Sequence, residues 1–107
     1  MISTHILDTS LGLPAQGVTV ELEKKTGENW KVLGSEATNP DGRIAFDCPR
    51  EAGTYRLQFR IEPYFRGNGI IPFFPLATVI FEITDIGRKY HIPLLLNPYG
   101  YSTYRGS

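Results

Sequence analysis

The chain has 107 residues, enough for one domain with its own core and too few for two. Eleven basic residues balance eleven acidic ones, so no net charge draws the chain toward nucleic acid or an anionic membrane, and we expect neither as a partner. Cys48 is the single cysteine, which excludes an intrachain disulfide. We therefore expect one domain over residues 1–107 that packing alone stabilises.

Short β-strands separated by turns account for most of the chain. Apolar residues occupy every second position near residues 17–25, and Asn39-Pro40-Asp41-Gly42 has strong turn chemistry. One or two helical turns are expected over residues 62–69, where Pro63 suits the first turn. In chain order, the predicted strands are residues 2–9, 17–25, 30–38, 43–46, 54–61, 77–83, 91–96 and 99–105. About eight short strands with at most one short helix indicate an all-β fold, an antiparallel β-sandwich.

Signals for export or membrane insertion bear on the compartment. The first residues lack the basic segment and following apolar run of a signal peptide. No apolar stretch approaches the ~20 residues that span a bilayer. Together with the lone cysteine, these features predict a cytoplasmic protein. A mature periplasmic form that begins with a new methionine is the alternative.

The two histidines, His5 and His91, both lie in predicted strands. A histidine in a strand is usually half-buried and held by a local hydrogen bond. The same side chain is also the natural general base near neutral pH. No third histidine, cysteine or carboxylate stands at ligand spacing beside them, so we expect no metal site.

Strand alternation places both histidines on an outer sheet face. His5 shares a face with Leu7, and His91 shares one with Pro93 and Leu95. The opposite faces carry the apolar residues that suit a sandwich core. Because the histidine faces are themselves apolar, we expect them to be covered at an interface.

Several motifs occur in one order along the chain. Near the start stands Thr-His-Ile-Leu-Asp (4–8), and the last residues are Tyr-Ser-Thr-Tyr-Arg-Gly-Ser (101–107). Between them lie Pro-Ala-Gln-Gly-Val (14–18), Thr-Asn-Pro-Asp-Gly-Arg (38–43), Tyr-Phe (64–65) with Phe-Phe-Pro (73–75), and Tyr-His-Ile-Pro-Leu-Leu-Leu (90–96). Over nearly the whole chain, these motifs resemble those of 5-hydroxyisourate hydrolases in the transthyretin-related family.

The resemblance implies a transthyretin-like sandwich that assembles as a homotetramer, a dimer of dimers, with clefts between the dimers. It also implies hydrolysis of 5-hydroxyisourate, a small-molecule substrate from urate breakdown, to 2-oxo-4-hydroxy-4-carboxy-5-ureidoimidazoline. No cofactor is implied. Carried over by motif, the catalytic residues are His5, Arg43, His91 and Ser107. The residues that shape the cleft and bind substrate are Tyr104, Arg105 and Gly106.

These residue types suit the opening of a cyclic amide. A neutral histidine can take a proton from water, which typically contributes about 10²–10⁴-fold to the rate. Arg43, which alone reads as a solvated charge after a turn, would offer fixed donors to developing negative charge. Either histidine can be the base, and His91 is favoured. A transthyretin-like carrier would share the fold and the channel without this set of residues, and is the alternative function.

Alternation along the last residues gives an expectation for the tail. Tyr104 and Gly106 share a face, so Tyr104 would face the cleft of the histidines and Gly106 would leave room there for the substrate ring. Ser107 can reach that cleft only if the last residues leave strand geometry. Arg105 would brace this bend through a carboxylate or carbonyl partner.

Overall fold

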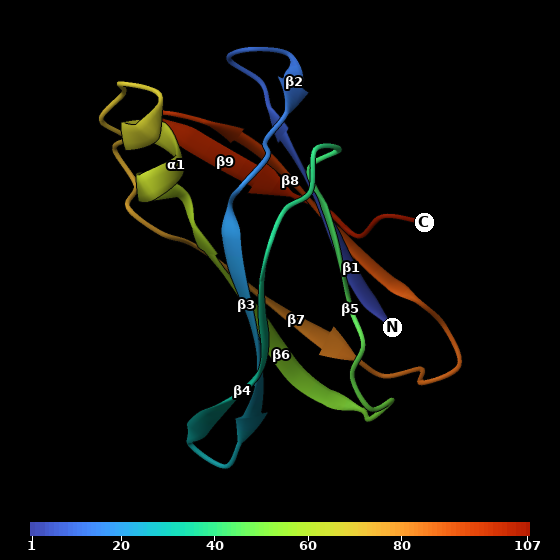
Figure 1. Ribbon diagram of the computed structural model, residues 1–107. Coiled ribbons are helices and arrows are strands. Elements are labelled where there is room, and N and C mark those ends of the chain that lie inside the picture. Colours follow the sequence, from blue (N-terminus) through green and yellow to red (C-terminus); the bar gives the residue numbers. More distant parts are fainter.

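Two β-sheets pack face to face in the computed structural model, which describes residues 1–107 (Figure 1). In chain order the elements are β1 (Ile2–Asp8), β2 (Leu13–Pro14), β3 (Thr19–Thr26), β4 (Asn29–Ala37), β5 (Arg43–Phe46), β6 (Gly53–Arg60), α1 (Ile61–Gly67), β7 (Ala77–Ile83), β8 (Tyr90–Asn97) and β9 (Gly100–Thr103). One sheet has the order β2-β1-β8-β9, with β5 also paired to β1, and the other has the order β4-β3-β6-β7. The all-β sandwich with one short helix is therefore confirmed.

The strand positions follow the alternation in the sequence, with small differences. The two-residue strand β2 was not predicted, because two residues carry no alternation; it pairs with Leu7 and Asp8. The last strand is shorter than predicted, since β9 ends at Thr103. The helix has seven residues, begins at Ile61, and is too short to span a bilayer.

One strand pair departs from the antiparallel prediction. β1 and β8 run parallel, from Ile2 opposite Tyr90 to Asp8 opposite Leu96. Alternation shows which face a residue occupies but not the direction of its partner strand, so a single sequence does not show this pairing. It places β1 in the interior of its sheet, with β8 on one side and both β2 and β5 on the other.

The core lies between the two sheets, and β1 shows how the strands fill it. Its seven residues alternate strictly between buried and half-buried, starting with the buried Ile2. His5 is half-buried while Ile6 is fully buried, so the histidine faces outward as predicted. His91 is likewise half-buried on β8 beside the buried Ile92.

A buried carboxylate joins the helix to β1. Asp8 is 2% exposed and accepts hydrogen bonds from the Tyr64 hydroxyl at 2.7 Å and from the amide and hydroxyl of Ser10. These donors offset the cost of burying a charge.

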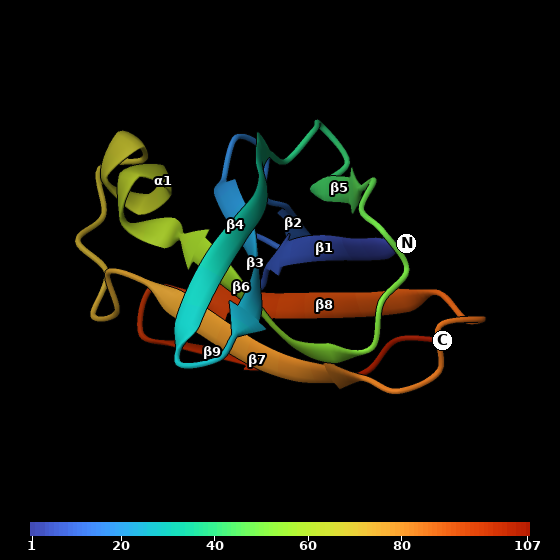
Figure 2. The same cartoon turned by 90° about the horizontal axis from the view of Figure 1, so that it is seen from below.

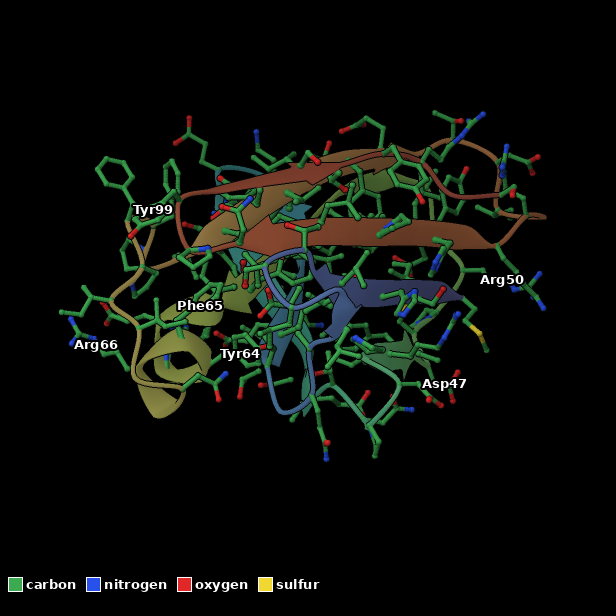
Figure 3. All side chains as sticks on the ribbon, turned by 90° about the horizontal axis from the view of Figure 1, so that it is seen from above. Asp47, Arg50, Tyr64, Phe65, Arg66 and Tyr99 are labelled. Carbon is green, nitrogen blue, oxygen red and sulfur yellow. The ribbon has the colours of Figure 1, made fainter.

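Figure 3 shows Tyr64 and Phe65 on α1 at one end of the sandwich, with Asp47 and Arg50 at the other. Both chain termini lie at the end away from α1 (Figure 2).

Candidate active site

Strand register brings three of the expected site residues to one outer sheet face. His5 on β1 lies opposite Arg43 on β5, and Ser3 lies opposite His91 on β8. Residues paired across neighbouring strands project to the same face, and Ser3 and His5 are two apart on one strand. The side chains of His5, Arg43 and His91 therefore project from one face, contributed by three adjacent strands.

The tail after β9 runs back beside β8, the strand that carries His91. Gly106 forms an isolated bridge with His91, and its amide donates a hydrogen bond to the His91 carbonyl at 2.8 Å. Because β9 ends at Thr103, the last residues have left the regular strand, as the expectation for Ser107 required. Ser107 follows the buried Gly106 and is exposed. It makes no side-chain hydrogen bond to the histidines.

Gly106 packs against the imidazole of His91. A Cβ at position 106 would lie 2.6 Å from Cδ2 of His91 and 3.2 Å from Cγ, well inside van der Waals contact. The glycine is therefore needed by the protein's own ring, and the room that we expect it to leave for a substrate ring stays a prediction. Arg105 is exposed and makes no hydrogen bond or ion pair, so the brace expected of it is absent from the single chain.

The surroundings of His91 favour its neutral form. Ser3 Oγ lies 2.8 Å from Nδ1 of the ring. Burial holds the pKa of His91 below its usual value of 6.5, and the Arg43 guanidinium and His5 lower it further. A hydrogen bond with the Ser3 backbone opposes part of this effect on the pKa. A neutral imidazole at neutral pH can accept a proton.

A groove of about 300 Å³ runs between β7 and the tail. His91, Tyr104 and Arg105 line it on the tail side, and Ile80 and Glu82 line it from β7. Tyr104 and His91 thus share a groove, but neither His5 nor Arg43 reaches it. The outer face that carries the three candidate catalytic side chains is an open surface in the single chain.

Cys48 and a metal centre are the other places where chemistry could reside. Burial raises the pKa of the Cys48 thiol, which keeps it protonated and unreactive near neutral pH. No group of three or more histidine, cysteine or acidic side chains is placed to hold a metal ion.

Ser3 is the site residue that sequence reasoning missed. It stands two residues before His5, so alternation alone places it on the histidine face. Its contact with His91, however, depends on the parallel register of β1 and β8.

Comparison with known proteins gives concordant results. A family model described as "HIUase/Transthyretin family" matches residues 2–106. The 5-hydroxyisourate hydrolase of Salmonella dublin is 46% identical over 110 residues, which cover 100% of this chain and 81% of the relative. The structure of Klebsiella pneumoniae 5-hydroxyisourate hydrolase has a TM-score of 0.87 and 42% identity, covering 99% of this chain and 98% of that one. Transthyretin from Sparus aurata has a TM-score of 0.92 and 30% identity, covering 98% and 95%.

The contact between Gly106 and His91 gives a first prediction. In Gly106→Ala the new methyl group should push the imidazole outward, and the pKa of His91 should rise toward its usual value as burial of the ring decreases. Gly100→Ala is the matched control, because a Cβ there would meet only Asn97 Oδ1 at 3.9 Å. NMR titration of the His91 ring in each variant measures its pKa. Identical His91 titrations in the parent and Gly106→Ala would contradict the contact.

Proposed function

The chain belongs to the HIUase/transthyretin family, and on this premise we propose that it is a 5-hydroxyisourate hydrolase that acts through the face of His5, Arg43 and His91. Relatives at this level of identity are named as this enzyme in bacteria and in the mouse. The observation that carries the proposal is the convergence of three strands: they place a histidine of lowered pKa beside a guanidinium and a second histidine.

The reaction adds water to a ring carbonyl and breaks its bond to nitrogen. His91, held neutral, takes a proton from the attacking water and then returns it to the leaving nitrogen, acting as base and then as acid. Arg43 carries a fixed charge for the oxygen that becomes negative. His5, opposite Arg43, hydrogen-bonds the same part of the substrate. No cofactor takes part in this scheme.

The tail completes the proposed site. Ser107 directly follows Gly106, which contacts the His91 ring, so its hydroxyl is available to the water or the substrate beside that ring. Tyr104 and Arg105 line the groove next to His91 and are proposed to bind substrate there. The groove holds only one of the three catalytic side chains, which leaves the substrate to be enclosed by a second copy of the chain.

We propose that this second copy belongs to a homotetramer, a dimer of dimers. Both sheets end in an unpaired strand on the same side of the sandwich, β7 in one and β9 in the other. Unpaired edges of this kind pair with other chains. The outer face also carries the half-buried Leu7 and Leu95, which suit contact with a facing dimer. The lone cysteine, which allows no intrachain disulfide, fits a reducing compartment, and we propose the cytoplasm.

A non-catalytic carrier is the second candidate function. It is favoured by the likeness to the transthyretin of Sparus aurata, which extends over 98% of this chain. In that case the same outer face would bind a small molecule and release it unchanged. A test of turnover separates the two functions.

Freshly prepared 5-hydroxyisourate should disappear faster with the protein than by its spontaneous decay, followed by ultraviolet absorbance. His91→Asn should lower kcat/KM by about 10²–10⁴-fold, the usual contribution of a general base, with an unchanged melting temperature. Removal of residues 105–107 should lower kcat/KM by more than about tenfold, because the tail beside His91 is lost. The melting temperature should change little, since few core contacts are lost. If the parent protein leaves the decay rate unchanged, the enzyme proposal fails and the carrier gains support.

The pH dependence of kcat/KM follows from the lowered pKa of His91. Above that pKa the imidazole is neutral and active as a base, and below it the ring is protonated and inactive. Activity should therefore fall on acidification with a midpoint below 6.5. Arg43→Gln removes a positive neighbour, so the residual activity should show a midpoint closer to 6.5. A parent midpoint above 6.5 would contradict the role given to burial and Arg43.

The assembly should have about four times the chain mass of 12.0 kDa. Sedimentation equilibrium at micromolar concentration measures it. A monomer that is fully active would overturn the proposal that a second copy encloses the substrate.

A further inference from the structure

The hydroxyl of Ser3 contacts the proposed base but has no part in the reaction described above. We infer that Ser3 is a positioning residue: its oxygen holds Nδ1 of His91, so that Nε2 is the ring nitrogen that takes the proton from water. This inference rests on the proposed function and adds to it which atom of His91 reacts and what fixes that choice.

Strand pairing on both sides fixes the position of Ser3. It lies opposite His91 on β8 and opposite Ala45 on β5, in a strand interior to the sheet. Its Oγ lies 2.8 Å from Nδ1, and both side chains are half-buried. Because neither backbone can shift without breaking the ladder, the contact is a constant feature of the face.

The other edge of the ring is closed by the tail. A Cβ built on residue 106 would lie 2.6 Å from Cδ2 and 3.2 Å from Cγ of His91, so Gly106 covers the carbon edge of the ring. Nδ1 is the only ring nitrogen of His91 with a hydrogen-bond partner in the chain. Nε2 is therefore the nitrogen left for water and substrate.

The nitrogen that takes a proton must carry the lone pair, so Nδ1 must carry the hydrogen in the neutral ring. An oxygen that accepts from Nδ1–H stabilises this tautomer. On our inference the Ser3 hydroxyl oxygen accepts from Nδ1–H, whereas in the opposite tautomer the same hydroxyl would donate to Nδ1.

The test compares three variants in the full chain. Ser3→Ala should lower kcat about tenfold with little change in KM, because the ring is less well oriented while the substrate contacts remain. Ser3→Thr keeps a hydroxyl on the same carbon and should restore most of the kcat. Ser35→Ala is the matched control, since Ser35 is exposed on β4 in the other sheet and should change nothing. All three should melt within a few degrees of the parent.

Nitrogen NMR of His91 supplies a readout that a merely structural serine would not move. The parent should show a protonated Nδ1 and an unprotonated Nε2 above the pKa of the ring, and Ser3→Ala should show a mixture of tautomers. Both samples share the same titratable and charged neighbours. Arg43 and His5 act on the ring itself, and the groove that His91 lines also holds Glu82, Tyr90, Tyr104 and Arg105.

Two results would overturn the inference: a parent ring with its proton on Nε2, or a Ser3→Ala variant that keeps the parent tautomer and kcat. The NMR experiment needs no substrate. A protein that fails to hydrolyse 5-hydroxyisourate would thus end the proposed function, while the tautomer still decides what Ser3 does to His91.

Discussion

The seven residues of β1 pair in parallel with seven residues of β8, and the positions of both histidines follow from that register. Ser3 comes opposite His91, which allows its hydroxyl to meet the ring, and His5 comes opposite Pro93. β5 then adds Arg43 on the far side of β1. A shift of β1 by one residue would turn Ser3 and His5 toward the core and away from Arg43 and His91. The buried alternate residues of β1, such as Ile6, hold the register because they have no other place to pack.

The chemistry of the face depends on what surrounds His91 more than on the fold. Burial and a neighbouring guanidinium both disfavour a second positive charge, so the ring stays neutral where an exposed histidine would begin to protonate. The sandwich itself is shared with the transthyretin of Sparus aurata over nearly the whole chain. A shared fold does not decide between a carrier and an enzyme, and the difference must lie in the side chains of one face.

Local patterns in the sequence predicted the parts of the structure that local physics decides. Alternation located the main strands and placed His5 and His91 on an outer face, and Pro63 marked the first turn of α1. The local pattern around Arg43 indicates only a solvated charge after a turn, and its role is implied by the family resemblance alone. Ser3 contacts His91 from 88 positions away in the sequence, and this contact depends on a strand register that alternation leaves open. Gly106 contacts His91 only because the tail bends back after β9.

The same parallel pairing constrains how the protein folds as it is synthesised. β3, β4 and β6 are near neighbours in sequence and pair with one another, so their sheet can assemble early. β1 leaves the ribosome before these strands, yet its long partner β8 is made after all of them. Contacts of such sequence separation slow folding, because the chain between them must first be ordered. Until β8 arrives, the apolar side chains of β1 lack half of their sheet, and this interval is when the nascent chain is most exposed to aggregation.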